Sequence, residues 1–165
     1  MSEAGDAGVD HQTPGPASDT AATLRAFLVY LRASVQRKLQ GCTDDEARSA
    51  PVSSGTSLLG LAKHLEFVER YWVQYRLHGL DIGPVSGDGF ALEPADDVAS
   101  VLDAYRATGA RSDELLAGTD LEAPAARTTH GLTAGWVLVH LVEETARHAG
   151  HADVLRELLD GSAGR

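Results

Sequence analysis

The sequence has only one cysteine, Cys42, among its 165 residues. A single thiol cannot form an internal disulfide or a multi-thiolate zinc site, so any metal site has to use histidine, aspartate or glutamate. No apolar run approaches the roughly 18 to 20 residues that cross a bilayer, which excludes a membrane span. Basic residues are also scarce, since 14 Lys and Arg stand against 24 Asp and Glu, for a net charge of −10. This charge argues against nucleic acid as a partner, because phosphate binding requires a basic surface.

The first residues differ in composition from the rest of the chain. Residues 1–18 are rich in glycine, alanine, aspartate and proline, and they contain neither the basic nor the apolar segment of a secretory signal. We therefore expect a disordered tail and a cytoplasmic protein. The remainder is long enough for one core, so we expect a single domain over residues 19–161.

Four segments have the apolar spacing of amphipathic helices, and no segment alternates as a strand does. The first has its apolar stripe at Leu24, Leu28, Leu31, Val35 and Leu39. The second extends from N-cap candidates at residues 53–56 to residue 78, the third covers about residues 95–116, and the fourth about residues 133–159. A connection rich in glycine and proline, residues 79–94, separates the second helix from the third. Four such helices predict an all-α protein, a four-helix bundle that buries one stripe of each helix.

Polar side chains interrupt the apolar stripes of two predicted helices. The predicted inward seam of the last helix extends from Val137 to Leu158. It includes Glu144 and His148, which are four residues apart and therefore share one face. The second helix places His64 on its own seam. A buried carboxylate without a partner is costly, so Glu144 needs solvent, hydrogen bonds or a cation. Two imidazoles and a carboxylate on facing helices are a familiar ligand set for zinc, and they also suit Fe(II) or Ni(II).

Spacing by itself leaves a second interpretation open. In that interpretation His64 is a core histidine satisfied by a backbone carbonyl, and Glu144 and His148 form a pair on the helix surface. His151 follows on the same seam. Four roles are open for it, namely an additional metal ligand, a substrate contact, a support for a ligand, or a polar residue that lines a wet cavity. His140, one turn before Glu144, bonds that carboxylate, faces the pocket or faces solvent.

The same spacing predicts roles for residues outside the candidate site. We expect Glu66 and Glu69 to lie on a solvated face of the second helix. Trp72 and Trp136 are expected to anchor the core. The charged residues of the last helix should pair with one another at the surface.

Two segments resemble the signature segments of the DinB-like superfamily, namely PVSSGTSLLGLAKHLEFVERYW over residues 51–72 and WVLVHLVEETARHAGHADVLREL over residues 136–158. The resemblance covers nearly the whole chain after the tail and is closest to the actinobacterial branch of the superfamily. It implies a four-helix bundle whose metal ion is bound by one side chain of the second helix and two of the last, here His64, Glu144 and His148. Many members have histidine in place of Glu144. The glutamate resembles the ligand set of the mycothiol-dependent maleylpyruvate isomerases.

The resemblance also implies a chemistry. Three protein ligands leave a coordination position open, where a thiol or a water molecule loses its proton more easily. Relatives of known activity use low-molecular-weight thiols, so we expect mycothiol or a similar thiol as co-substrate, with its sulfur attacking an electrophilic substrate. The alternatives are a metal-dependent hydrolase with water as nucleophile, and a metal-binding or ligand-binding bundle without turnover. Relatives are often dimers, which makes a homodimer an expectation for this chain.

Overall fold

The computed structural model describes residues 13–128 and 131–162, so most of the predicted tail lies outside the described residues. The elements follow in the order α1 (Thr20–Leu39), α2 (Asp44–Arg48), α3 (Leu58–Glu69), the π-helical segment η1 (Arg70–Leu77), α4 (Val98–Leu116) and α5 (Ala134–Asp160). Within this part of the chain there is no strand beyond one isolated bridge, and the predicted all-α fold is confirmed. None of the described helices combines the length and the apolarity needed to cross a membrane.

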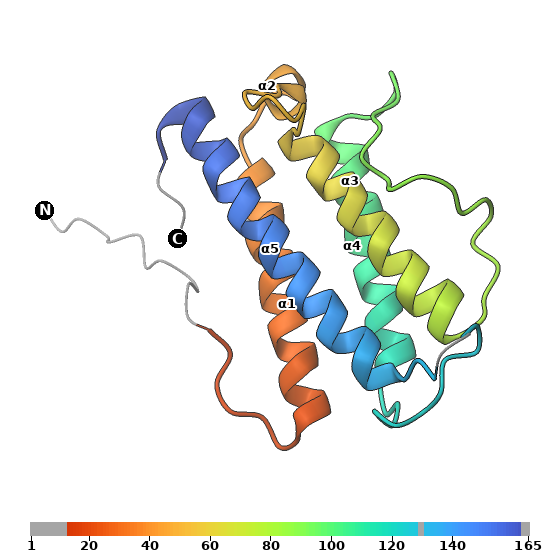
Figure 1. The fold of residues 1–165 in the computed structure, drawn as a ribbon. Helices are drawn as coiled ribbons and strands as arrows, with labels where there is room; N and C mark the ends of the chain where they lie inside the picture. The colour runs from red at the N-terminus through yellow and green to blue at the C-terminus, as the bar shows by residue number, and fades with distance from the viewer. Residues whose placement is uncertain (1–12, 129–130, 163–165) are drawn as a thin grey trace, which may run out of the picture.

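Four long rods make up the bundle, namely α1, α3 with η1, α4 and α5 (Figure 1). α1 packs along α5, α3 packs against α4 and α5, and η1 prolongs α3 without a break. The space between the rods is filled by apolar side chains, and Leu28, Leu65, Tyr105 and Leu138 are at most 2% exposed. Burying one such side chain stabilises the folded state by roughly 1.5–3 kcal/mol. The apolar stripes therefore hold the bundle together.

Each long α-helix begins at a side-chain cap, which accepts a hydrogen bond from a backbone N–H of the first turn. The caps of α1, α3, α4 and α5 are Asp19, Ser57, Asp97 and Thr133. The prediction that α3 is capped within residues 53–56 is wrong, because the bond to the Gly60 N–H comes from Ser57, at 3.1 Å. The short helix α2 was not predicted from apolar spacing, and a capping box between Thr43 and Glu46 holds it.

The second predicted helix does not stay α-helical to its end. After Glu69 the backbone widens into the π-helical turns of η1. Val68 and Val73 are five residues apart, a spacing that an α-helix puts on different sides but a π-turn brings to one side. Both valines are buried, at 9% and 0% exposure, whereas Trp72 packs only at the edge of the core. The core position predicted for Trp72 is thus taken by Val73.

A buried ion pair crosses the bundle where we expected a solvated glutamate. Arg32 of α1 and Glu69 of α3 are 5% and 2% exposed, and they form two contacts of 2.8 Å. A third contact of 2.8 Å joins Arg32 to Asp113 of α4. A Cβ at Gly109 would lie 3.3 Å from Arg32 Cδ, so this glycine leaves room for the arginine. The predicted solvated face for Glu69 is wrong, because an arginine from another helix neutralises its charge inside the protein.

Two apolar residues of α5 are exposed although we predicted them in the core. Trp136 is 50% exposed, because it directly precedes the buried Val137 and the helix turns by about 100° per residue. Leu158, at the far end of the predicted seam, is 56% exposed. A straight α-helix drifts by roughly 20° per heptad from a strict seven-residue repeat. Over three heptads this drift turns Leu158 out of the seam.

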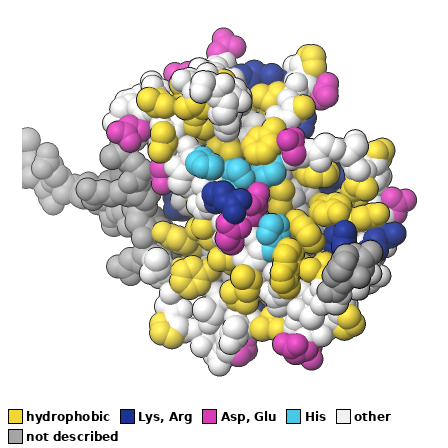
Figure 2. All heavy atoms as spheres, in the orientation of Figure 1, with side chains coloured by type: hydrophobic (Ala, Val, Ile, Leu, Met, Phe, Trp, Pro, Cys, Tyr) yellow, Lys and Arg dark blue, Asp and Glu magenta, His cyan; other side chains and the backbone are white. Residues whose placement is uncertain are grey.

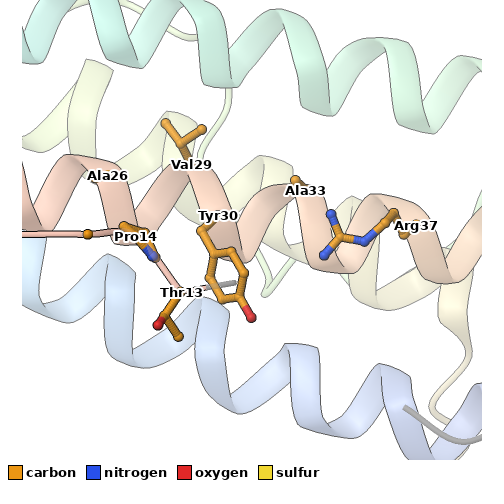
Figure 3. A pocket seen from close by; sticks show the side chains of 8 residues that line it. Thr13, Pro14, Ala26, Val29, Tyr30, Ala33 and Arg37 are labelled. Atoms are coloured by element: carbon orange, nitrogen blue, oxygen red, sulfur yellow. The ribbon is translucent and has the colours of Figure 1, made fainter. Parts of the chain in front are cut away.

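One broad cavity lies on the outside of α1. It measures about 560 Å³ and is closed on one side by residues 13–15 (Figure 3). Tyr30 and Arg37 are among the side chains that line it. The described residues of its lining include no histidine, cysteine or carboxylate, so they offer none of the ligand types that the sequence pointed to.

Candidate metal centre

The three predicted ligands meet between α3 and α5. His64 comes from α3, whereas Glu144 and His148 come from successive turns of α5. One donor atom of each residue lies within 4.8 Å of the other two. Glu144 Oε1 is 3.2 Å from Nε2 of His64 and 3.2 Å from Nε2 of His148. Figure 2 shows histidine, acidic and basic side chains gathered near the middle of this face of the molecule.

The ring of His64 is held by the loop that follows η1. Its Nδ1–H donates to the backbone carbonyl of Asp88, and Phe90 stacks on the ring with the centroids 3.9 Å apart. A carbonyl oxygen only accepts, so Nδ1 carries a proton, and in the neutral ring Nε2 presents its lone pair to Glu144. Histidines that bind metal ions commonly use their second nitrogen in this way.

His148 is oriented in a similar manner by a neighbour on its own helix. Its Nδ1 lies 3.4 Å from Nδ1 of His151, which leaves Nε2 facing Glu144. Burial lowers the pKa of His148, a charge on His64 acts in the same direction, and Glu144 opposes both. The lowered pKa favours the neutral ring, and the neutral tautomer that carries its proton on Nδ1 offers a lone pair at Nε2.

Glu144 supplies the negative charge of the centre. Burial alone would raise its pKa, but the contacts with His64 and His148 and the charge of Arg147 outweigh burial and hold the pKa below its usual value. Arg147 Nη1 donates to Oε2 at 2.8 Å, so Oε1 is left for the two imidazoles. The carboxylate is therefore ionised and oriented by a side chain that is itself 53% exposed.

The three side chains fit a divalent cation. When neither Nε2 atom carries a proton, the lone pairs of the two Nε2 atoms and of Oε1 point into the same space, where a divalent cation would take the place of the ring protons that otherwise bond Glu144. Two ligands at about 2.0–2.1 Å from a zinc ion, at a tetrahedral angle, are roughly 3.4 Å apart. The observed separations of 3.2 Å from Oε1 to each Nε2 are close to this value. The three donors as a set span up to 4.8 Å, so a bound zinc ion would draw them closer together.

Two further histidines lie nearby without joining the cluster of three donors. His151 is exposed, meets the nitrogen of His148 that is not directed at Glu144, and lines a cavity next to α5. His140 lies between the rings of Trp72 and Trp136, with centroids 4.8 and 5.1 Å away, and burial lowers its pKa. His151 thus lines a cavity and also contacts a candidate ligand.

Two supports of the centre were missed in the sequence. Arg147 was expected in a surface pair, and it does pair with Glu143, but it also holds Glu144. The second support is the backbone carbonyl of Asp88, which orients the ring of His64. Every residue has a backbone carbonyl, so the residue type does not reveal this contact. The only signal was the glycine-rich composition of residues 79–94, where Gly87 and Gly89 flank Asp88.

Replacing Gly89 by alanine is expected to weaken metal binding by about 10- to 100-fold, as loss of a group that orients a ligand does. Gly89 has a φ of +81°, and a Cβ there would lie 2.8 Å from Phe67 Cβ and 3.2 Å from His64 Cα. The loop must therefore move away from α3, which separates the Asp88 carbonyl and Phe90 from the ring of His64. The measurement is zinc affinity by competition with a chromophoric chelator.

Gly87→Ala is the matched control. Gly87 lies in the same loop with a φ of +75°, so alanine meets the same backbone strain, but a Cβ there meets no atom within 4 Å. Its zinc affinity should equal that of the wild type. Equal losses in the two variants would show that the loop matters through its own strain rather than through contact with His64.

The bundle, with donors on its second and last long helices, has the arrangement of the DinB-like class that the sequence resembles. A profile of the family described as Mycothiol-S-transferase matches residues 23–161, and the chain belongs to this family. The resemblance stated from the two segments is therefore confirmed.

A solved structure supports the fold independently. The crystal structure of the conserved protein of locus from Enterococcus faecalis aligns with a TM-score of 0.65, over 88% of this chain and 100% of that chain. The two sequences are 16% identical, so the likeness concerns the fold alone. No match is found among curated proteins.

Proposed function

We propose that this protein is a metal-dependent thiol S-transferase that uses mycothiol or a closely similar small thiol. The observation that carries the proposal is the convergence of His64, Glu144 and His148 within 4.8 Å, in a chain that belongs to the mycothiol-S-transferase family. Zinc suits two imidazoles and one carboxylate best, with nickel and iron as alternatives. The partners are the thiol and an electrophilic small molecule.

The roles of the residues follow from their contacts. His64 and His148 would hold the cation through Nε2, and Glu144 through Oε1, while Asp88, His151 and Arg147 keep these atoms oriented. A divalent cation bound there supplies a Lewis acid that favours the deprotonated form of a nearby thiol or water. Glu144 also offsets part of the cation's charge, so its negative charge influences how strongly the centre acidifies a thiol.

The chain has no thiol of its own suited to the reaction. Cys42, the only cysteine, lies after α1, where its Sγ is 2.7 Å from Arg156 Nη1. Burial raises the pKa of Cys42, although Arg156 opposes this, so the sulfur favours the neutral and weakly nucleophilic thiol. The nucleophilic sulfur should therefore arrive as a co-substrate.

The test is a conjugation assay at known metal content. Wild-type protein loaded with zinc should consume mycothiol in the presence of monobromobimane or 1-chloro-2,4-dinitrobenzene, faster than with bacillithiol, glutathione or no thiol. Glu144→Gln should lower the rate by at least about 10-fold even when fully loaded, because a neutral ligand changes the charge of the site. Hydrolysis without any thiol would favour a metal-dependent hydrolase. A fully loaded protein without turnover would favour a binding bundle.

A further inference from the structure

Another cavity, separate from the one that residues 13–15 border, lies beside the candidate metal centre. It measures about 240 Å³ and opens between α5 and the loop that precedes α3. Its lining consists of Val52, Ser54, Thr56, His151, Val154 and Leu155. No residue of this cavity belongs to the three donors, so the cavity is an additional site rather than part of the centre.

One imidazole separates the cavity from the centre. His151 lines the cavity and also meets His148, with the two Nδ1 atoms 3.4 Å apart and the ring centroids 5.3 Å apart. A molecule seated against His151 is therefore next to the ring of a candidate metal ligand. A molecule in the cavity is therefore well placed to react with a second molecule bound at the metal centre.

The lining indicates the kind of molecule that fits. Val52, Val154 and Leu155 form apolar walls, and none of the six lining residues is a carboxylate, a lysine or an arginine. Ser54 and Thr56, whose hydroxyls are 2.9 Å apart, sit together on the loop side. Apolar walls with a few placed polar groups are typical of sites for small organic ligands. The cavity thus suits a small neutral molecule with an apolar body and few polar groups.

The thiol itself is a poorer match for this cavity. A sugar-based thiol such as mycothiol carries many hydroxyl groups, and each of them loses hydrogen bonds to water when it is buried without a partner. The cavity offers three polar side chains and three apolar ones. Such a lining leaves most hydroxyls of a sugar without a hydrogen-bond partner, whereas an apolar ring or chain has no hydrogen bonds to lose on burial.

We propose that this cavity binds the electrophilic substrate and determines which electrophiles are accepted, a proposal that rests on the proposed transferase function. With 1-chloro-2,4-dinitrobenzene as the electrophile, the sulfur of the thiol forms a bond to the ring carbon that bears chlorine. The carbon–chlorine bond breaks, chloride leaves with the electron pair, and the proton of the thiol passes to solvent. The protein supplies no atom to the product.

The experiment fills the cavity and leaves the centre untouched. Val154 and Val139 both lie on α5 and are 53% and 55% exposed, and only Val154 lines the cavity. Val154→Trp should block the cavity, and Val139→Trp is the matched control for an added indole on the same helix. Ser54→Trp closes the cavity from the loop side and serves as a second variant if Val154→Trp melts below Val139→Trp.

Binding is measured without turnover, with 1,3-dinitrobenzene as an unreactive probe, by saturation-transfer NMR. Wild type and Val139→Trp should bind the probe equally, and the two cavity variants at least about 10-fold more weakly. In the conjugation assay the cavity variants should raise the KM for 1-chloro-2,4-dinitrobenzene by a similar factor, with zinc content and the KM for mycothiol unchanged. Unchanged probe binding in the cavity variants, or a raised KM for mycothiol instead, would overturn the proposal. Absence of any conjugation by the wild type would contradict the transferase function, while the probe measurement still decides whether the cavity binds.

Discussion

Replacing Arg32 by alanine is expected to lower the free energy of unfolding by about 3–5 kcal/mol, the effect typical of breaking a buried ion pair from one side. Arg32 is the only described cation within 2.8 Å of Glu69, and both side chains are almost fully buried. Removing the guanidinium leaves a carboxylate inside the bundle without its counter-charge. The loss is a large share of the roughly 5–15 kcal/mol by which small domains are stable.

The measurement is urea denaturation followed by circular dichroism, with all proteins in EDTA so that metal binding does not contribute. Arg106→Ala is the control, because Arg106 pairs with Asp103 at 3.1 Å and is 49% exposed. Arg106→Ala should change the free energy of unfolding by no more than about 0.5 kcal/mol. A similar loss in both variants would contradict the role given to Arg32.

A double variant separates the charge from the packing. Replacing Arg32 and Glu69 together by methionine removes both charges and keeps much of the apolar volume. Such exchanges of buried pairs are often neutral or stabilising. The double variant should therefore be more stable than Arg32→Ala, and a double variant that is less stable would show that the charges themselves are required.

The second large effect is expected for the candidate metal centre. His64→Ala should lower zinc affinity by more than the roughly 10- to 100-fold that loss of a supporting group costs, because the variant loses one of three donors. The measurement combines metal analysis of the purified protein with chelator competition. Far-UV circular dichroism should stay close to that of the wild type, since the apolar stripes are intact.

Two other histidines of this face provide the controls. His140→Ala removes a half-buried ring that stacks on Trp136, and zinc affinity should be unchanged. His151→Ala removes a neighbour of His148, so it should lower zinc affinity by no more than about 100-fold. Full zinc occupancy in His64→Ala would exclude His64 as a ligand. A loss in His151→Ala as large as in His64→Ala would make His151 a ligand instead.

The helices and the stripe of candidate ligands could be predicted from the sequence because these features depend on spacing within one helix. Glu144 and His148 share a face at any i,i+4 spacing in an α-helix, whatever else the helix contacts. The start of α5 after Thr133 also follows from a local hydrogen bond, to the N–H of Trp136. The same spacing failed at Trp72, because local periodicity assumes α-helical turns throughout and η1 has π-helical ones.

The sequence by itself determined an all-α bundle and the inward positions of His64, Glu144 and His148, since apolar periodicity and capping act between residues close in the chain. Only the tertiary structure decided what those side chains meet. Glu69 is buried because Arg32, 37 residues away, enters from α1, and His64 is oriented by a backbone carbonyl 24 residues away. The cavity next to His151 likewise exists only where the loop before α3 packs against α5. Contacts between distant segments depend on how the helices pack against one another, and no spacing within a single helix specifies that packing.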